Sequence, residues 1–265
     1  MCLDSLSRLT YPQATPVVID NGSEDDSVHE IRRAYPDVHI LELEKNLFYG
    51  GGNNAGLKWA AENKFDYIVF LNNDTTVEPD FIEPLINAFS VSEKVGMAGP
   101  LMCYSATPQL VWYGGGIVNL WTGRVAHKFI RSTIQAVPNG PKVTDYISGC
   151  CMMMSTNLAT ELEGFDPIFT MYGEDVDLSL RCRKAGYRLI FAPESKIFHK
   201  VSASIGGEFS ARKIKRKLAG LLQLFARHAY WYQWPGIALG QLATLLFKSR
   251  LILKAIRGFR ETSSR

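Results

Sequence analysis

The sequence feature that most constrains the fold is a nearly unbroken apolar run that ends abruptly in two amides and a carboxylate. Asp66–Leu71 reads DYIVFL, and Asn72, Asn73 and Asp74 follow it directly. A strand that is buried on both faces of a parallel sheet is apolar throughout. Ligands of such sheets bind outside the carboxyl ends of the strands. We therefore predict a parallel sheet with Asp74 at its ligand-binding edge.

Strand-like and helix-like patterns alternate along the chain. Strands are predicted at 15–20, 38–44, 66–71, 95–102, 145–155 and 187–193, and helices at 3–10, 24–35, 53–63, 79–89, 157–165 and 173–186. The glycines Gly50–Gly52 are predicted to form a loop. This order predicts an α/β fold, Rossmann-like, with a doubly wound and mostly parallel sheet. Because a helix precedes the first predicted strand, the sheet is expected to lack the strand that normally opens a doubly wound nucleotide-binding fold.

Charge divides the chain into two parts. Residues 206–265 carry twelve Lys and Arg against two Glu, a net charge of +10, whereas residues 1–205 carry a net charge of −7. Within the basic part, Ala229–Phe247 contains no charged residue, but Pro235 and two glutamines make it a poor membrane span. We predict a domain over 1–205 and a helical tail over 206–265 that lies on an anionic membrane surface. The alternative is a helical pair that packs on the domain.

The cysteines and the distribution of basic residues limit the surroundings of the chain. Five cysteines, an odd number without metal-ligand spacing, indicate reduced thiols in a cytosolic protein. No secretory signal is recognised at Met1. The excess of basic over acidic residues is confined to a tail with aromatic residues in an apolar run, which argues against a nucleic-acid partner. We expect a cytoplasmic protein, peripheral on the inner face of the cell membrane, and leave self-association into a homo-oligomer open.

Four polar sites end predicted strands or open a predicted helix. They are Asp20, Asp74, the cluster Glu174, Asp175 and Asp177, and His199. An aspartate in the position of Asp20 is more often a turn or cap residue. The prediction of a functional site therefore depends on all four sites occurring together. Transfer from a nucleotide diphosphate donor needs a divalent cation on oxygen and imidazole ligands, a role that suits Asp74 and His199. It also needs a base for the attacking hydroxyl, which suits Asp175 beside Glu174.

The glycine-rich stretch Gly50–Gly52 permits close approach of the backbone to a donor. It has neither the Gly-Lys-Ser/Thr of a Walker loop nor the spacing of a dinucleotide fingerprint, so ATP hydrolysis and dinucleotide binding are not expected.

At this level of detail the chain resembles the family 2 inverting glycosyltransferases of the GT-A fold, particularly their rhamnosyltransferase-like bacterial branch. The resemblance covers roughly residues 3–206 and runs in the family's order. It rests on VVIDNGSEDDS, EKNLFYGGGNNAGL, VFLNNDTTVEPDF, SGCCMMMS, EGFDPIFTMYGEDVDLSLRCRKAGYRLIFAPESKIFH and SASIG.

The resemblance implies a role for each matching residue. The residues expected to bind the nucleotide are Asp20, Asn21, Asn46, Gly50, Gly51, Asn53 and Asn73. Asn72 stands in place of the first Asp of the Asp-X-Asp metal motif, so Asp74 would be the main carboxylate on Mg or Mn, with His199 completing the site. Asp175 would be the catalytic base and Glu174 an acceptor or positioning residue. Asp166 and Tyr172 would border the acceptor.

The function so implied is inverting transfer of a sugar from a nucleotide diphosphate donor to a hydroxyl of a glycan or polyprenyl-linked acceptor, in cell-surface polysaccharide synthesis. The first donor expected is dTDP-rhamnose, followed by UDP-linked hexoses or galactofuranose. Two alternatives stay open. One is an inactive, truncated GT-A domain that serves as a binding or scaffold protein. The other is a nucleotidyltransferase, which would usually carry an N-terminal glycine- and arginine-rich phosphate loop.

Overall fold

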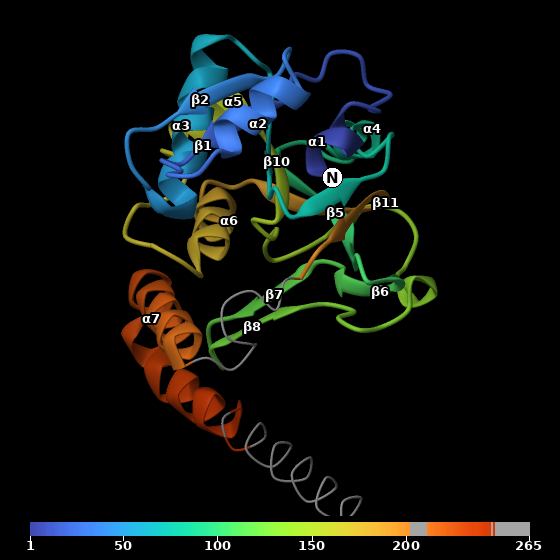
Figure 1. The fold of residues 1–265 in the computed structure, drawn as a ribbon. Helices are drawn as coiled ribbons and strands as arrows, with labels where there is room; N and C mark the ends of the chain where they lie inside the picture. The colour runs from blue at the N-terminus through green and yellow to red at the C-terminus, as the bar shows by residue number, and fades with distance from the viewer. Residues whose placement is uncertain (202–210, 245, 247–265) are drawn as a thin grey trace, which may run out of the picture.

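A mixed sheet of seven strands forms the centre of the molecule (Figure 1). The computed structural model describes residues 1–201, 211–244 and 246. The strand order is β3-β10-β5-β11-β4, with β6 paired to β5 and β9 to β11. The strands are β3 Tyr67–Leu71, β4 Thr75–Val77, β5 Val95–Tyr104, β6 Thr107–Tyr113, β9 Lys142–Val143, β10 Cys151–Ser155 and β11 Arg188–His199.

The direction of the strands matches the prediction only in part. β5 and β11 are parallel, and β3 runs the same way, because β10 lies antiparallel between β3 and β5. β4 is antiparallel to β11. β3 stands at the end of the strand order beside the antiparallel β10, and its apolar run did not reveal in which direction the neighbouring strand runs.

The first two predicted strands form a sheet of their own. β1 (Val17–Asp20) and β2 (His39–Glu42) pair in parallel, and within the described residues they are not hydrogen-bonded to the large sheet. Helix α1 (Cys2–Leu6) precedes β1, as predicted, and packs beside β4. A third, two-stranded sheet is the hairpin of β7 (Gly116–Asn119) and β8 (Arg124–His127).

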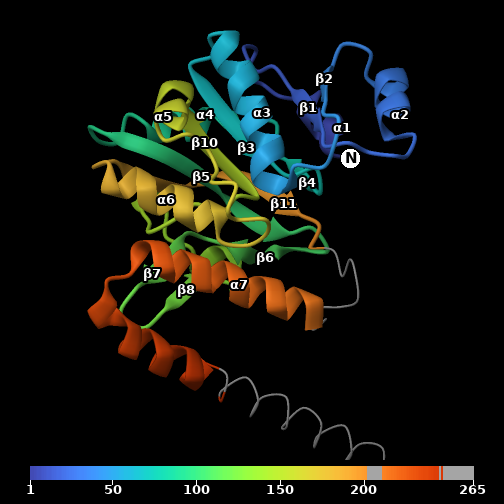
Figure 2. The ribbon, with the colours of Figure 1, turned by 90° about the vertical axis from the view of Figure 1, so that its left-hand side faces the viewer.

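Helices cover both faces of the large sheet (Figure 2). Helices α3 (Phe48–Glu62), α5 (Thr156–Glu161) and α6 (Glu174–Lys184) lie on one face, and α4 (Ile82–Ala88) lies on the other with α1. Helix α2 (Ser27–Ala34) accompanies the β1–β2 sheet. Buried side chains of α3, α5 and α6 share one hydrophobic cluster with β3 and β10, whereas α4 belongs to a second cluster.

The prediction of a loop at Gly50–Gly52 was wrong, because these glycines lie in the first turns of α3. A Cβ atom at Gly50 would stand 3.0 Å from the Cβ of Phe165, and one at Gly52 would stand 3.2 Å from Nδ2 of Asn21. The glycines therefore let the helix approach its neighbours closely. This packing overrides the low helix propensity of glycine, on which the loop was predicted.

The described part of the tail packs on the domain. Helix α7 (Ala211–His228) lies against α6 (Figures 1 and 2), and its Leu224 and Phe225 are buried in the main core. A short 3₁₀ turn at Trp231–Gln233 and helical residues 234–244 follow. The alternative of a helical pair on the domain thus describes this part of the chain.

In the part of the tail that the structure describes, no helix has the length and apolar character of a membrane span. The predicted boundary at 205/206, the whole SASIG motif and everything from 247 onward lie outside the described residues.

Candidate active site

Asp175 is held at the start of α6 by two backbone N–H groups. Gly149 N donates to its Oδ2 at 2.9 Å, and Val176 N donates to its Oδ1 at 2.8 Å. The Tyr49 hydroxyl of α3 in turn donates to the carbonyl of Gly149. The carboxylate is therefore fixed between α6, α3 and the turn before β10.

Burial raises the pKa values of the two neighbouring carboxyl groups. Desolvation, and then the charge of Asp175, raise the pKa of Glu174 to about 7. Desolvation also raises the pKa of Asp175, against the stabilising N–H groups of Gly149 and Val176. Glu174 Oε2 is buried and has no hydrogen-bond partner among the described residues. Because two close carboxylates cannot ionise independently, the two groups titrate as a pair, with pKa values above the usual carboxyl range.

Asp74 and His199 are brought together by the pairing of β4 with β11. His199 pairs in register with Thr75, and Lys200 N donates to the carbonyl of Asp74 at 2.8 Å. As a result, Nε2 of His199 lies 3.2 Å from Oδ1 of Asp74. The imidazole ring also packs edge-on to Trp112, with the ring centroids 4.4 Å apart.

A hydrogen bond between the end of β3 and the start of β10 connects the Asp74–His199 pair to the carboxylates of α6. Asn72 N, at the end of β3, donates to the carbonyl of Cys150 at 2.9 Å, and Cys150 follows the residue that binds Asp175. Burial first, and then nearby negative charges that include Asp74 and Asp175, raise the pKa of the Cys150 thiol. The negative charges of Asp74 and Asp175 therefore both raise the pKa of the same thiol.

The Asp74–His199 pair has the donor atoms that a hard divalent cation takes. Nδ1 of His199 is buried without a hydrogen-bond partner among the described residues, and the buried Oδ1 of Asp74 has only its 3.2 Å contact with Nε2 of His199, which does not meet hydrogen-bond geometry, among those residues. No third carboxylate, thiol or imidazole of the described chain completes a cluster of three with them. A cation here would need further oxygen ligands from outside the chain, and the oxygens of a diphosphate are of the required kind.

Several residues predicted to bind the nucleotide hold local structure together. Oδ2 of Asp20 accepts from Ser23 N at 3.2 Å, which is the turn role foreseen as the alternative for this residue. Oδ1 of Asn21 accepts from Leu47 N at 2.8 Å, and Oδ1 of Asn46 accepts from Phe48 N at 2.8 Å. Asn21 and Asn46 thus order the entry to α3.

The remaining predicted nucleotide residues lie along α3 and the β3 turn. Asn53 Nδ2 donates to the carbonyl of Tyr49 within the helix at 2.9 Å. Gly50 is buried, whereas Gly51 is half-buried and close to Leu47. Asn73 is exposed beside Asp74. Their contact with a nucleotide stays a prediction.

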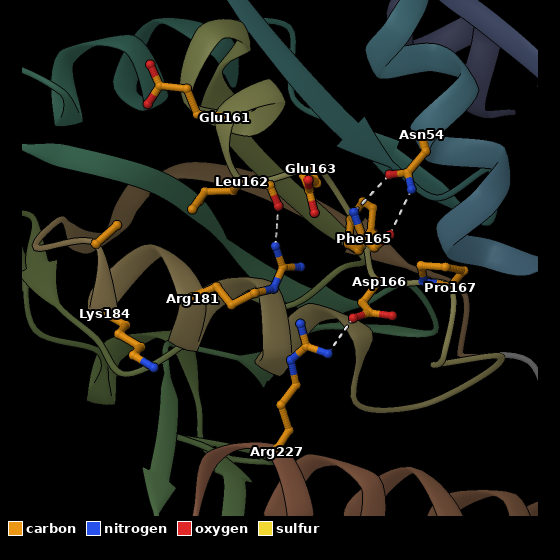
Figure 3. A pocket seen from close by; sticks show the side chains of 11 residues that line it. Asn54, Glu161, Leu162, Glu163, Phe165, Asp166, Pro167, Arg181, Lys184 and Arg227 are labelled. Carbon is orange, nitrogen blue, oxygen red and sulfur yellow. Dashed lines mark hydrogen bonds and ion pairs between the residues drawn. The ribbon is translucent and has the colours of Figure 1, made fainter.

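Asp166, one of the two residues predicted to border the acceptor, lines a pocket. The pocket has a volume of about 520 Å³ and lies beside the C-terminal half of α6 (Figure 3). It is lined by Asn54, Glu161, Leu162, Glu163, Phe165, Asp166, Pro167, Arg181, Lys184, Ala185 and Arg227. Asp74 and Asp175 do not line it. Tyr172 precedes α6 with a backbone φ of 70°.

Sequence reasoning missed two residues of α7, Arg227 and His228, that contact α6. Asp177, whose side chain is fully buried, pairs with Arg181 of the same helix at 2.8 Å, and also with Arg227 at 3.0 Å and His228 at 2.7 Å. Burial alone would raise the pKa of Asp177, but hydrogen bonds from His228 and Arg181 hold it below its usual value. No local sequence pattern indicated these contacts, because the partners lie about fifty residues further along the chain.

Comparison with known proteins places the chain in a family. Residues 1–162 match the model of the glycosyl transferase family 2 domain. The chain is 28% identical to the N-acetylglucosaminyl-diphospho-decaprenol L-rhamnosyltransferase of Mycobacterium tuberculosis, over 88% of this chain and 81% of that protein. It is 26% identical to the undecaprenyl-phosphate mannosyltransferase of Micrococcus luteus, over 71% of this chain and 75% of that protein.

A solved structure supports the same fold. The crystal structure of GalNAc-T7 with UDP, GalNAc and Mn²⁺ superposes with a TM-score of 0.65 and 18% identity. It covers 83% of this chain, which spans 44% of the length of that chain. The fold is that of the GT-A glycosyltransferases. Since the family model matches more than half of the residues, the chain belongs to glycosyl transferase family 2.

Proposed function

We propose that the chain transfers a sugar, with inversion, from a nucleotide diphosphate donor to a hydroxyl of a lipid-linked glycan acceptor. One observation carries the proposal. A carboxylate with a raised pKa, Asp175, and an Asp74–His199 pair lie at the same edge of the sheet. The first donor we propose is dTDP-rhamnose, and the first acceptor is an N-acetylglucosamine joined to a polyprenyl diphosphate. The name of the mycobacterial relative supports this choice of sugar and acceptor.

The mechanism that we propose is a single displacement. The acceptor oxygen attacks the anomeric carbon of the donor sugar while the bond from that carbon to the diphosphate oxygen breaks. The acceptor proton moves to a carboxylate oxygen of Asp175, and the nucleoside diphosphate leaves on the opposite face, which inverts the configuration. Burial suits Asp175 to this role, because a base with a pKa close to the working pH accepts a proton most effectively.

Asp74 and His199 are the residues that would hold a divalent cation. Such an ion, when bound, offsets the negative charge that develops on the leaving diphosphate. The side chains themselves contribute by position. The N–H of Lys200 bonds the backbone carbonyl of Asp74, and the ring of Trp112 packs against the imidazole of His199, so both residues are held in place.

Calorimetric titration with nucleoside diphosphates tests the donor half of the proposal. We expect dTDP or UDP to bind in the presence of Mn²⁺, and we expect binding to weaken when EDTA removes the ion. The corresponding nucleoside monophosphates, which lack the second phosphate, should bind more weakly. No binding of either diphosphate, in the presence of Mn²⁺, would argue for the inactive, scaffolding alternative.

The coupled carboxyl pair predicts an acid limit to activity. Asp175 must be ionised to act as base, and burial raises its pKa, so the acid-side loss of activity should occur at a higher pH than for an ordinary aspartate. In Glu174→Gln the second negative charge is absent, so Asp175 should ionise at lower pH and the acid limb should move to lower pH. The measurement is initial rate against pH. Glu93→Gln, at an exposed position outside the site, is the control and should leave the limb unmoved.

We also propose that the tail places the protein on the cytoplasmic face of the membrane. Apolar residues that the fold leaves exposed gather in this part of the chain. The most exposed are Trp231 at 83%, Leu239 at 68% and Tyr230 at 65%. Together with the net charge of +10 over 206–265, these residues suit an anionic lipid surface.

Replacing Trp231 and Leu239 together by Ser is expected to weaken sedimentation with vesicles of phosphatidylglycerol and phosphatidylcholine. Withdrawing one large apolar side chain from lipid costs about 1.5–3 kcal/mol, or roughly ten- to a hundredfold in partitioning for each position. Val91→Ser, also an exposed apolar residue but outside the tail, should have no effect. Equal loss in both proteins would argue against docking through the tail.

A further inference from the structure

Helix α7 holds both ends of the segment that carries the proposed base. The segment 166–177 contains Tyr172, Glu174 and Asp175. At its start, Asp166 pairs with Nη1 of Arg227, and at its end, Asp177 pairs with Nε of the same residue at 3.0 Å (Figure 3 shows the first of these contacts). One guanidinium therefore joins the two ends of the segment.

The middle of the segment also rests on α7. Tyr172 and Gly173, directly before Glu174, have backbone φ angles of 70° and 102°. A non-glycine residue in this region is strained by about 1–3 kcal/mol and keeps the conformation only when its surroundings impose it. A Cβ atom at Gly220 of α7 would collide with the carbonyl of Tyr172, so the two backbones are in direct contact. The strained turn thus abuts the backbone of α7.

The contacts of α7 leave the proposed catalytic atoms untouched. Within the described residues, Asp175 is bonded by Gly149 and Val176, and neither Arg227 nor His228 contacts it. Leu224 and Phe225 anchor α7 in the core independently of the ion pairs. The side chain of Arg227 itself is 40% exposed, so its removal opens no cavity in the core. Its contribution is to fix the segment, and not to hold α7 in place.

We propose that Arg227 is a positioning residue for acceptor transfer, which it supports by pairing with Asp166 and Asp177 and so fixing the segment that carries Asp175. The inference rests on the proposed function. A guanidinium suits the role because it offers separate nitrogen atoms to two carboxylates in a planar arrangement. A single ammonium group cannot reproduce both contacts. Acceptor use should therefore depend on the shape of this side chain as well as on its charge.

The test compares Arg227→Gln and Arg227→Lys with the unaltered protein, using polyprenyl diphosphate-linked N-acetylglucosamine as acceptor and dTDP-rhamnose as donor. We expect kcat/KM for the acceptor to fall about ten- to a hundredfold in both variants, as for a small misplacement of a reacting group. The KM of the donor and the affinity for dTDP should change by less than about twofold, since Asp74 and His199 lie outside the segment. The lysine variant should recover only a small part of the loss.

Two controls separate positioning from loss of charge or folding. Lys215→Gln removes a positive charge from an exposed residue of the same helix and should leave kcat/KM unchanged. Amide hydrogen exchange should be faster over 166–177 in Arg227→Gln, with α4 and β5 as protected as before. In the double variant Asp166→Asn with Arg227→Gln, the fold-loss in kcat/KM for the acceptor should be smaller than the product of the fold-losses of the two single variants, because the two residues share one contact.

The outcomes are distinct. If the unaltered protein transfers no sugar to this acceptor from any donor offered, the proposed function fails. If the unaltered protein is active and Arg227→Gln retains its acceptor kinetics, the inference about Arg227 fails while the function stands. If donor affinity, acceptor kinetics and protection of the whole core fall together, Arg227 serves stability alone, and the inference also fails.

Discussion

Asp175→Asn should lower the rate of sugar transfer by about a thousandfold, within the range of roughly 10²–10⁴ that general base catalysis contributes. The amide cannot accept the acceptor proton, but it has nearly the same shape. Its oxygen can still accept one of the hydrogen bonds from Gly149 and Val176 that hold the native carboxylate. The affinity for donor nucleotide should therefore stay within a few-fold of the native value.

The control for this substitution is Asp66→Asn, which changes an exposed aspartate at the opposite end of β3. Its rate should equal that of the unaltered protein. A stopped or radiometric assay of product formation under saturating donor measures both. If Asp175→Asn kept more than about a tenth of the native rate, Asp175 would not be the base. Glu174 would then be the next residue to examine.

The second large effect is expected at the Asp74–His199 pair. Asp74→Asn should reduce kcat/KM for the donor by about a hundredfold and should raise the Mn²⁺ concentration needed for half-maximal activity. The reason is that, among the described residues, this is the carboxylate paired with His199, and removing its charge weakens the binding of a divalent cation there. Activity measured over a manganese titration gives both quantities.

Asp80→Asn, at an exposed position shortly before α4, is the matched control and should show the native metal dependence. His199→Gln should resemble Asp74→Asn in direction. Its loss includes the packing of the ring against Trp112, so Asp74→Asn is the cleaner variant. Native metal dependence in Asp74→Asn would mean that the cation, if one is used, is held elsewhere.

The sequence pattern predicted correctly those helices and strands whose own residues show a strong helical or strand pattern. The strand at 66–71, the helix with acidic first and basic last turn, and the helix before the first strand all form, with ends shifted by a few residues. The juxtaposition of Asp74 and His199 was also predicted in outline, because both follow strands that end at the same edge. Their catalytic and metal roles stay predictions.

The features that sequence did not predict depend on contacts between distant residues. The glycines of α3 are helical because Phe165, more than a hundred residues away, lies against Gly50. The three-residue strand β4 is too short to show a period of two, yet it is what brings Asp74 to His199. The pairing of Arg227 with Asp166 and Asp177 likewise has no local pattern to reveal it.

The tail shows how composition can suggest two outcomes at once. Its apolar, aromatic stretch predicted a membrane-facing segment, with packing on the domain as the alternative. In the described residues, α7 buries Leu224 and Phe225 and the following helix buries Ile237, while Trp231 and Leu239 stay exposed. Burial of one set of apolar residues explains the packing, and exposure of the other set motivates the proposed contact with lipid.

The central claim is that this edge of the sheet transfers a sugar from a nucleotide diphosphate. The most direct measurement is release of nucleoside diphosphate from a panel of nucleotide sugars, with Mg²⁺ or Mn²⁺ and polyprenyl diphosphate-linked N-acetylglucosamine, for the native protein, Asp74→Asn and Asp175→Asn. We predict metal-dependent, acceptor-dependent release from one donor, dTDP-rhamnose first, and its loss in both variants. No release from any donor, or release that both variants retain in full, would contradict the claim.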